Sequence, residues 1–373
     1  MIDSVPESAL PAAAPALRQR LLAWYERERR DLPWRRRSDA YAIWVSEIML
    51  QQTTVQTVVP YWRRFLELFP NVRSLANADL DAVLGAWSGL GYSRRARMLH
   101  AAAKRIVNER GGRLPQTLEG WRALPGVGSY TAAAIGSIAL GLPSPAIDGN
   151  VQRVLTRLTK TGGDPRRTAV ARRLESLARS LIDEDRPGEF NQALMELGAM
   201  VCLPRRPSCP SCPWGTSCAA RRDGVVEDYP QLAPARPAVT VVRGAVRLFN
   251  GRGRVLLTRV APGEPNQGLL ELPGTVLYHG RSDHPAHAPR RWCPELALQL
   301  RDRLASEKRL FVEIGSLLRR VRHGITHHRI TVYLTQAEAV ARVPSGKAWC
   351  WVDPRRLSGL PLTGVTRRLL ESG

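Results

Sequence analysis

Four cysteines lie close together in the second half of the chain and are its clearest candidates for metal chemistry. Cys202, Cys209, Cys212 and Cys218 follow the pattern C-x6-C-x2-C-x5-C and are four of the six cysteines present. Prolines interleave them, so we expect an irregular loop with its thiols turned inward. Four clustered thiolates hold an iron–sulfur cluster or a structural zinc ion, and the spacing favours the cluster without excluding zinc. Disulfides are the third alternative, which an intracellular chain disfavours.

A glycine-containing turn is the second feature. Leu124-Pro125-Gly126-Val127-Gly128 separates a short predicted helix, Leu118–Arg122, from a longer one that begins near Ser129. Gly126 and Gly128 allow a tight turn, and the N–H groups at a helix start bind anions. The pattern predicts a helix–hairpin–helix that contacts a DNA phosphate, with a plain interhelical turn as the alternative.

Two carboxylates could act as an acid and an electrostatic partner. Asp148 follows a Gly/Pro-rich loop, 141–148, at the start of a predicted helix, and Glu47 follows an apolar stretch. A sequestered Glu47 would keep its proton and act as an acid, while an ionised Asp148 would stabilise a positive charge nearby. Paired carboxylates divide these tasks in glycoside hydrolysis. The alternatives are a helix N-cap for Asp148 and an exposed helical glutamate for Glu47.

Composition favours a polyanionic partner. Among 373 residues, Lys and Arg exceed Asp and Glu by 22, which favours nucleic acid. The first residues do not resemble a signal peptide, and no apolar run approaches the ~18 residues that span a membrane. We therefore expect a cytoplasmic protein with no membrane partner.

Hydrophobic periodicity divides the chain into a helical part and a part with strands. We expect an N-terminal tail at 1–16, an all-α domain at 17–218 that includes the cysteine loop, a linker at 219–238 and an α+β domain at 239–373. The predicted helices are Leu17–Glu28, Ala40–Leu50, Val55–Phe69, Ser93–Val107, Tyr130–Leu140, Asn150–Thr159, Thr168–Ile182 and Pro294–Ser306. The predicted strands are Val239–Leu248 and Arg254–Val260, joined as a hairpin at Asn250-Gly251, then Ile330–Leu334 and Ala348–Val352.

Together these motifs resemble a known enzyme family. A helix–hairpin–helix, a Gly/Pro loop ending in Asp148 and cysteines spaced 6-2-5 resemble the base-excision DNA glycosylases that include endonuclease III. Asp31–Arg35 and Trp44–Thr53 closely resemble the MutY-type adenine DNA glycosylases within that superfamily, as do Gly89–Tyr92 and Ala146–Val151. The resemblance covers roughly residues 17–220. It implies a monomeric enzyme, associated with the nucleoid, that removes adenine mispaired with 8-oxoguanine or guanine in double-stranded DNA and carries a 4Fe–4S cluster on the four cysteines.

The resemblance also implies catalytic roles. Glu47 protonates adenine and later handles the water, and Asp148 supports the oxocarbenium ion. Tyr130 and Asn150 position water and sugar. Bifunctional relatives such as endonuclease III carry a lysine where this chain has Tyr130, and a tyrosine cannot form the Schiff base that strand cleavage requires. We therefore expect base removal without strand cleavage.

The remaining expected DNA contacts also follow from the resemblance. An adenine pocket is expected, and two side chains are expected at the lesion inside the duplex. The pocket residues are Trp34, Arg35, Leu50 and Gln192, and the lesion residues are Gln52 and Tyr92. The family often has a second aromatic after Tyr92, where this chain has Ser93.

The C-terminal domain resembles the Nudix-like domain of MutY proteins. Gly268–Gly274 follows the hairpin as it does there, but residues 288–307 lack the carboxylate cluster R-E-x-x-E-E, so phosphohydrolase activity is not expected. The resemblance implies recognition of 8-oxoguanine. The family's Phe-Ser-His loop maps to Ile325-Thr326-His327, which loses an aromatic wedge and keeps a hydroxyl group.

Two other functions stay open at this point. One is an endonuclease III-like glycosylase with AP lyase activity, which Tyr130 and the extra domain disfavour. The other is a non-catalytic iron–sulfur DNA-binding protein, which the presence of both Glu47 and Asp148 disfavours.

Overall fold

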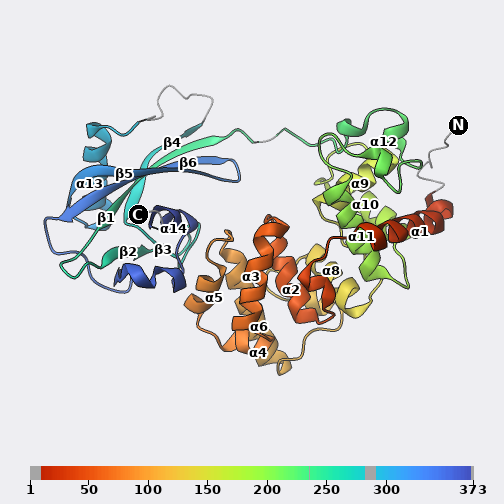
Figure 1. Cartoon of the computed structure of the whole chain (residues 1–373), viewed down its shortest axis with the longest axis horizontal. Helices are drawn as coiled ribbons and strands as arrows, with labels where there is room; N and C mark the ends of the chain where they lie inside the picture. The colour runs from red at the N-terminus through yellow and green to blue at the C-terminus, as the bar shows by residue number, and fades with distance from the viewer. Residues whose placement is uncertain (1–9, 235, 282–290, 371–373) are drawn as a thin grey trace. The chain divides into compact units, whose positions relative to one another are not determined.

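The computed structural model describes residues 10–234, 236–281 and 291–370, which form two compact units. Among these residues, unit 1 comprises the chain up to Ala76 together with Ala101–Pro234. Unit 2 comprises Asn77–His100 and the described residues after position 235. Unit 1 is helical and unit 2 combines helices with two sheets (Figure 1). The predicted fold class, an all-α part followed by an α+β part, is confirmed.

The helical part follows the predicted periodicity, but its first helix begins earlier than predicted. Three helices, Val72–Asn77, Leu80–Trp87 and Pro187–Met200, were not predicted. The first helix begins at Leu10 instead of Leu17, because Ala12–Ala14 are strong helix formers and Ala14 packs into the core. Residues 1–9 of the predicted tail lie outside the described residues. The elements are α1 (Leu10–Glu28), η2 (Pro33–Arg36), α2 (Ala40–Leu50), α3 (Val55–Leu68), α4 (Val72–Asn77), α5 (Leu80–Trp87), α6 (Arg94–Arg110), α7 (Leu118–Arg122), α8 (Ser129–Leu140), α9 (Gly149–Thr159), α10 (Thr168–Leu181), α11 (Pro187–Met200), η3 (Cys209–Ser211), α12 (Ala219–Arg222) and η4 (Val226–Asp228).

Helix α2 is the central helix of the candidate site. Every residue from Tyr41 to Met49 is buried, because the helix is apolar on all sides and packs against α3 and α8. Asp39 caps its start by accepting a hydrogen bond of 2.8 Å from the Ala42 N–H. A carboxyl group on this helix is therefore held away from water.

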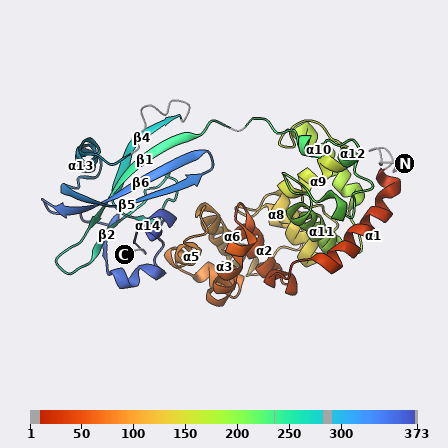
Figure 2. The ribbon, with the colours of Figure 1, turned by 45° about the horizontal axis from the view of Figure 1, so that its top comes forward.

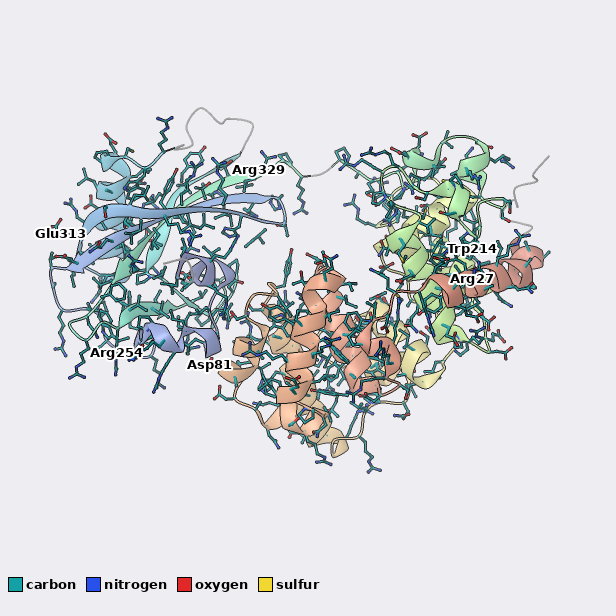
Figure 3. All side chains as sticks on the ribbon, viewed as in Figure 1. Arg27, Asp81, Trp214, Arg254, Glu313 and Arg329 are labelled. Carbon is teal, nitrogen blue, oxygen red and sulfur yellow. The ribbon has the colours of Figure 1, made fainter. Side chains whose placement is uncertain are left out.

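A second core joins α1, α9, α10 and α11. Leu21, Leu155, Leu174 and Leu194 are buried in it, and so is Trp214 from the cysteine loop. The Trp214 indole N–H donates to the Leu17 carbonyl at 2.9 Å (Figure 3). This anchor fastens the loop to the helices that carry the candidate site.

Unit 2 contains a four-stranded sheet in the order β4-β1-β6-β5 and a three-stranded sheet in the order β3-β2-β7. Helix α13 lies against one face of the larger sheet, and α14 with the smaller sheet lies on the other (Figure 2). The elements are β1 (Val239–Leu248), β2 (Val255–Arg259), β3 (Leu270–Glu271), β4 (Gly274–Arg281), α13 (Pro294–Lys308), β5 (Val312–Ile325), β6 (His328–Ala339), β7 (Trp349–Val352), η6 (Pro354–Gly359) and α14 (Gly364–Leu370).

The predicted hairpin turn at Asn250-Gly251 forms, but the strands on either side of it do not pair along their length. Beyond the turn they are joined by one antiparallel bridge, between Phe249 and Val255. Both edges of β1 are occupied, by antiparallel β4 and by parallel β6. Strand β2 therefore pairs with β3 and β7 in the other sheet.

Strand β5 was not predicted. It runs from Val312 to Ile325 and forms a long antiparallel hairpin with β6. Arginines 319, 320 and 322 interrupt its apolar residues, so the sequence lacks a clear two-residue period. Pairing with β6, rather than local propensity, forms this strand.

The segment predicted as a linker, 219–238, is partly folded. It includes α12 and η4, and the two units divide between Pro234 and Ala235, within the predicted range. The contacts also place Asn77–His100 in unit 2, which the sequence division at 17–218 did not anticipate. Among the described residues, no helix is both long and apolar enough to cross a membrane.

Candidate active site

A cavity of about 800 Å³ in unit 1 gathers most of the predicted site residues. Its walls come from η2, the C-terminal half of α2 and the turn after it, the starts of α8 and α9, and one face of α11. The predicted residues that line it are Trp34, Arg35, Glu47, Leu50, Gln52, Gly128, Tyr130, Asp148, Asn150 and Gln192. Residues more than 150 positions apart in the sequence therefore share one concave site.

Glu47 is buried on α2, with 6% of its surface exposed. The Tyr130 hydroxyl donates a hydrogen bond to Glu47 Oε2 at 2.9 Å. The pKa of Glu47 is raised to about 7. Burial is the main cause and the negative charge of Asp148 adds to the rise, while the Tyr130 hydrogen bond and the charge of Arg35 oppose it. Near neutral pH this carboxyl group can both hold and release a proton.

Asp148 has both carboxylate oxygens bonded at the start of α9. Oδ1 accepts from the Val151 N–H at 2.8 Å, and Oδ2 accepts from the Asn150 amide at 2.9 Å. Burial raises the pKa of Asp148 from its ordinary value, while these hydrogen bonds and Arg153 oppose the rise. Asp148 is thus an N-cap, as the plain interpretation held, and it also faces the cavity.

Glu47 and Glu196 both line the cavity, and their surroundings shift the pKa values of these two carboxyl groups in opposite directions. The Glu196 carboxylate, 1% exposed, accepts two hydrogen bonds each from the side chains of Arg30 and Arg35, at 2.6 to 3.1 Å. Burial opposes its ionisation, yet these two guanidinium groups lower the pKa of Glu196 to about 2. Glu196 therefore stays ionised while Glu47 titrates near neutrality, a separation that sets acid and base roles in many enzymes. Sequence reasoning missed Glu196.

The helix–hairpin–helix turn has the predicted form. Gly126 has φ of 77°, a left-handed conformation that glycine adopts without strain. Gly128 is the residue before α8, and a Cβ built there meets nothing within 4 Å. Gly128 lines the cavity, whereas Gly126 does not. The N–H groups of the first turn of α8 thus stand at an open surface.

A chain of hydrogen bonds leads from Asp148 to the first cysteine. Asn150 bonds Asp148, and the Arg153 guanidinium donates to the Asn150 Oδ1 at 2.9 Å and to the Cys202 carbonyl at 2.7 Å. A Cβ at Gly198 would lie 2.6 Å from the Asn150 Cβ, so only glycine fits there. The sequence offered no signal for Arg153 or Gly198, because an arginine on a helix is usually a surface residue.

The four predicted cysteines line one small cavity together with Arg157 and Arg221, and none forms a disulfide. Burial raises the pKa of Cys212 to about 12 and also raises the pKa values of Cys209 and Cys218. The described residues contain no group of three His, Cys, Asp or Glu side chains arranged to hold a metal ion.

Arg157 is the buried residue that ties this loop to α9, with 1% of its surface exposed. Its guanidinium donates to the Cys202 Sγ at 3.4 Å and to three backbone carbonyls. These are the carbonyls of Leu203, Pro204 and Tyr229, at 2.6, 2.9 and 2.9 Å. Its own carbonyl accepts from the Cys218 thiol at 3.3 Å. Sequence reasoning missed this residue as well.

Three predicted DNA-contacting residues belong to unit 2. Tyr92 and Thr326 both adopt left-handed backbone conformations, with φ of 49° and 52°. Thr326 and His327 form the turn between β5 and β6, where the His327 ring packs 4.2 Å from that of His328. These residues contribute nothing to the cavity of unit 1.

Part of the chain is similar to known DNA repair proteins. Residues 45–180 match the family described as HhH-GPD superfamily base excision DNA repair protein. The human adenine DNA glycosylase is 50% identical over 220 residues, covering 57% of this chain and 40% of that protein. The mouse adenine DNA glycosylase is 44% identical over 271 residues, covering 70% of this chain and 52% of that protein. The matched region thus spans about half or less of these relatives' length.

Solved structures agree on the helical fold. A thermostable thymine-DNA glycosylase matches with a TM-score of 0.53 and 28% identity, covering 58% of this chain and 99% of that one. An endonuclease III in a non-covalent complex with DNA matches with a TM-score of 0.50 and 20% identity, covering 57% of this chain and 97% of that one. The chain is therefore similar to the HhH-GPD superfamily of base excision DNA repair proteins over residues 45–180, and to the adenine DNA glycosylases over a longer stretch.

Proposed function

We propose that the protein is a monofunctional adenine DNA glycosylase. Its substrate is adenine mispaired with 8-oxoguanine or guanine in double-stranded DNA, and its reaction is hydrolysis of the N-glycosidic bond. The observation that carries this proposal is the pairing of Glu47, whose pKa is near 7, with Asp148 in one cavity. A purine leaves as a better leaving group once protonated, and the sugar it leaves behind is cationic.

The cavity residues divide the work as follows. The Glu47 carboxyl proton passes to a ring nitrogen of adenine, and the electrons of the breaking glycosidic bond move onto the base. The Asp148 carboxylate, which accepts hydrogen bonds from Val151 and Asn150, stabilises the positive charge on the sugar. Glu47, now a carboxylate, takes a proton from the water that adds to the sugar. The products are free adenine and an abasic site.

Adenine must leave the duplex to reach Glu47. Trp34 is buried beside the cavity, held edge-on against Trp62 with ring centroids 5.9 Å apart. We assign Trp34, Leu50 and Gln192 to the adenine pocket and Gln52 to the vacated space in the duplex. Arg35 supports the pocket from its fixed position on Glu196.

The rate of base removal should fall at alkaline pH. Glu47 must carry its proton, and its pKa is raised to about 7, so the single-turnover rate should fall about tenfold per pH unit above pH ~7.5. Below that pH the rate should hold until Asp148 itself becomes protonated. In Tyr130→Phe the opposing hydrogen bond is gone, so the alkaline inflection should move to higher pH. A rate that is constant from pH 6 to 9 would show that Glu47 is not the acid.

The products should distinguish this protein from a lyase. Tyr130 has no amine, so we expect an intact strand with an abasic site after incubation with an adenine:8-oxoguanine duplex, and cleavage only after alkali. Borohydride should trap no covalent complex. An endonuclease III-type enzyme run in parallel on its own oxidised-pyrimidine substrate supplies the positive control. Release of no adenine by the protein would overturn the proposed function, and robust trapping would overturn its monofunctional character.

We also propose a 4Fe–4S cluster on the four cysteines. All four cysteines line one small cavity, and four thiols are the donor set that an iron–sulfur cluster takes. Their spacing, in which only the middle pair is separated by two residues, favours the cluster over a structural zinc ion. When bound, the cluster would tie the loop together through four Fe–S bonds, and no step of base removal passes through it.

Residues 239–373 are proposed as a Nudix-like domain that recognises 8-oxoguanine through Thr326 and His327. The Thr326 hydroxyl, which donates to the Ile325 carbonyl in this structure, is exposed at the turn and free to rotate toward a base. DNA is the proposed partner of a monomer, which would place the protein with the nucleoid in the cytoplasm.

A further inference from the structure

The contacts of the segment Asn77–His100 group it with the described residues after position 235, in unit 2. It includes α5, the loop that carries Tyr92, and the first turns of α6. Four side chains of α5, at positions 83, 84, 86 and 87, are buried. Within unit 2, the segment contacts η6, Leu362, α14 and β2.

One contact is a backbone packed directly on a backbone. A Cβ built at Gly85 would lie 2.7 Å from the Gly359 carbonyl oxygen, a distance that real Cβ atoms do not reach. Gly85 lies inside α5, where alanine is the better helix former. Glycine at this position therefore allows η6 to pack closely against α5, although it does not favour the helix itself.

Polar contacts surround this approach. The buried Ser88 hydroxyl donates to the Leu362 carbonyl at 2.7 Å and accepts from Arg367 at 2.9 Å. The Arg259 guanidinium holds both oxygens of Asp81, at 2.9 and 2.8 Å (Figure 3). Two nitrogens facing two oxygens fix the orientation of the pair as well as its distance.

The loop after α5 is held in one conformation. Gly89 and Gly91 have φ of 110° and 74°, and the Trp87 indole N–H donates to the Gly91 carbonyl at 3.2 Å. The Arg95 guanidinium lies 5.5 Å from the ring centroids of both Trp87 and Tyr92. Tyr92, 38% exposed, is thus connected to Trp87 of α5 through Arg95 of α6.

We infer that α5 is a positioning helix, latched to the C-terminal domain, so that Tyr92 and the Thr326 turn meet the base opposite adenine as parts of one unit. The inference rests on the proposed function, because it takes that base to be contacted by Tyr92 and Thr326. The two units then have separate functions: the cavity of unit 1 removes adenine, and unit 2 recognises the opposing base. Gly85, Asp81 and Ser88 then set specificity without touching DNA.

Gly85→Ala tests the latch, with Gly359→Ala as its matched control because a Cβ at Gly359 meets nothing within 4 Å. Two readouts are needed. Hydrogen exchange of residues 88–93 in the full chain reports the latch, and the single-turnover rates of adenine removal opposite 8-oxoguanine and opposite guanine report specificity. In Gly85→Ala we expect faster exchange and a preference for 8-oxoguanine lowered about tenfold, the effect of one lost hydrogen bond, with neither change in Gly359→Ala.

A second pair of variants guards against misfolding. Asp81→Arg and Arg259→Asp should each lower the preference two- to fivefold, as exposed ion pairs do, and combining them should restore it. Faster exchange with an unchanged preference would overturn the inference, and so would a combined variant no better than its parents. If the unmutated protein removes no adenine, the proposed function fails by itself, and unchanged exchange in Gly85→Ala would separately refute the latch.

Discussion

Replacing Glu47 with glutamine is expected to abolish adenine removal while leaving DNA binding intact. Glutamine fills the same space on α2 and can still accept the Tyr130 hydrogen bond, but its amide cannot deliver a proton to the departing base. The expected loss in single-turnover rate is about 10²- to 10⁴-fold, the usual contribution of a positioned acid. Affinity for an adenine:8-oxoguanine duplex, measured by fluorescence anisotropy, should change less than about threefold.

The control for this variant is Glu67→Gln, which removes an exposed carboxylate from α3. It should match the unmutated protein in both assays. Full activity in Glu47→Gln would remove Glu47 from the mechanism. A parallel loss of binding and activity would instead indicate a role in holding DNA.

The pH dependence of folding stability should also reflect the raised pKa of Glu47. The pKa of Glu47 is higher in the folded protein than in the unfolded chain, so burial favours the protonated form. The stability associated with that form is present at low pH and lost as pH rises through about 7. Glutamine cannot ionise, and the Tm of Glu47→Gln relative to the unmutated protein should therefore be higher at pH 8.5 than at pH 6.

Replacing Arg157 with methionine is expected to weaken binding of the proposed 4Fe–4S cluster and to destabilise the cysteine loop. Methionine approximates the length of the side chain but leaves the carbonyls of Leu203, Pro204 and Tyr229 without their buried donor. The expected loss in unfolding free energy is on the order of 3 kcal/mol. The 4Fe–4S form should be brown, with absorbance near ~400 nm that this variant loses on purification.

Arg205→Met provides the matched control in the same loop. Arg205 is exposed and does not line the cysteine cavity, so its loss should leave iron content and Tm nearly unchanged. Iron content and Tm in Arg157→Met equal to those of the control would contradict the role of Arg157. A colourless, zinc-loaded protein prepared without oxygen would contradict the cluster itself.

The reactive groups could be found in the sequence because each is marked by its local neighbours. Glu47 lies in a largely apolar stretch, and Asp148 follows a Gly/Pro loop at a helix start. The four cysteines are interleaved with prolines. These signals are short in range, and the structure places Glu47, Tyr130 and Asp148 in one cavity as expected. Helix periodicity was equally local, so most helix bounds agree with the structure to within a few residues.

What the sequence did not reveal depends on partners distant in the chain. Glu196 is ionised only because Arg30 and Arg35 fold onto it, and Arg157 is a buried donor only because the cysteine loop closes over it. Pairing with β6 forms β5, and occupied edges on β1 send β2 to another sheet. Side-chain type predicts none of these outcomes, because each depends on which surface becomes available after folding.

The sequence by itself therefore determined the chemistry that the chain can perform. It supplies an acid on an apolar helix, an aspartate that caps a helix, a tyrosine in place of a lysine, and four thiols in one loop. Only the tertiary structure decided how these groups are tuned and grouped. Burial and neighbouring charges raise the pKa of Glu47 to about 7, and the approach of η6 to Gly85 places Tyr92 with the C-terminal domain. Types and short spacings are local properties of a chain, whereas desolvation and long-range packing exist only once the chain has folded.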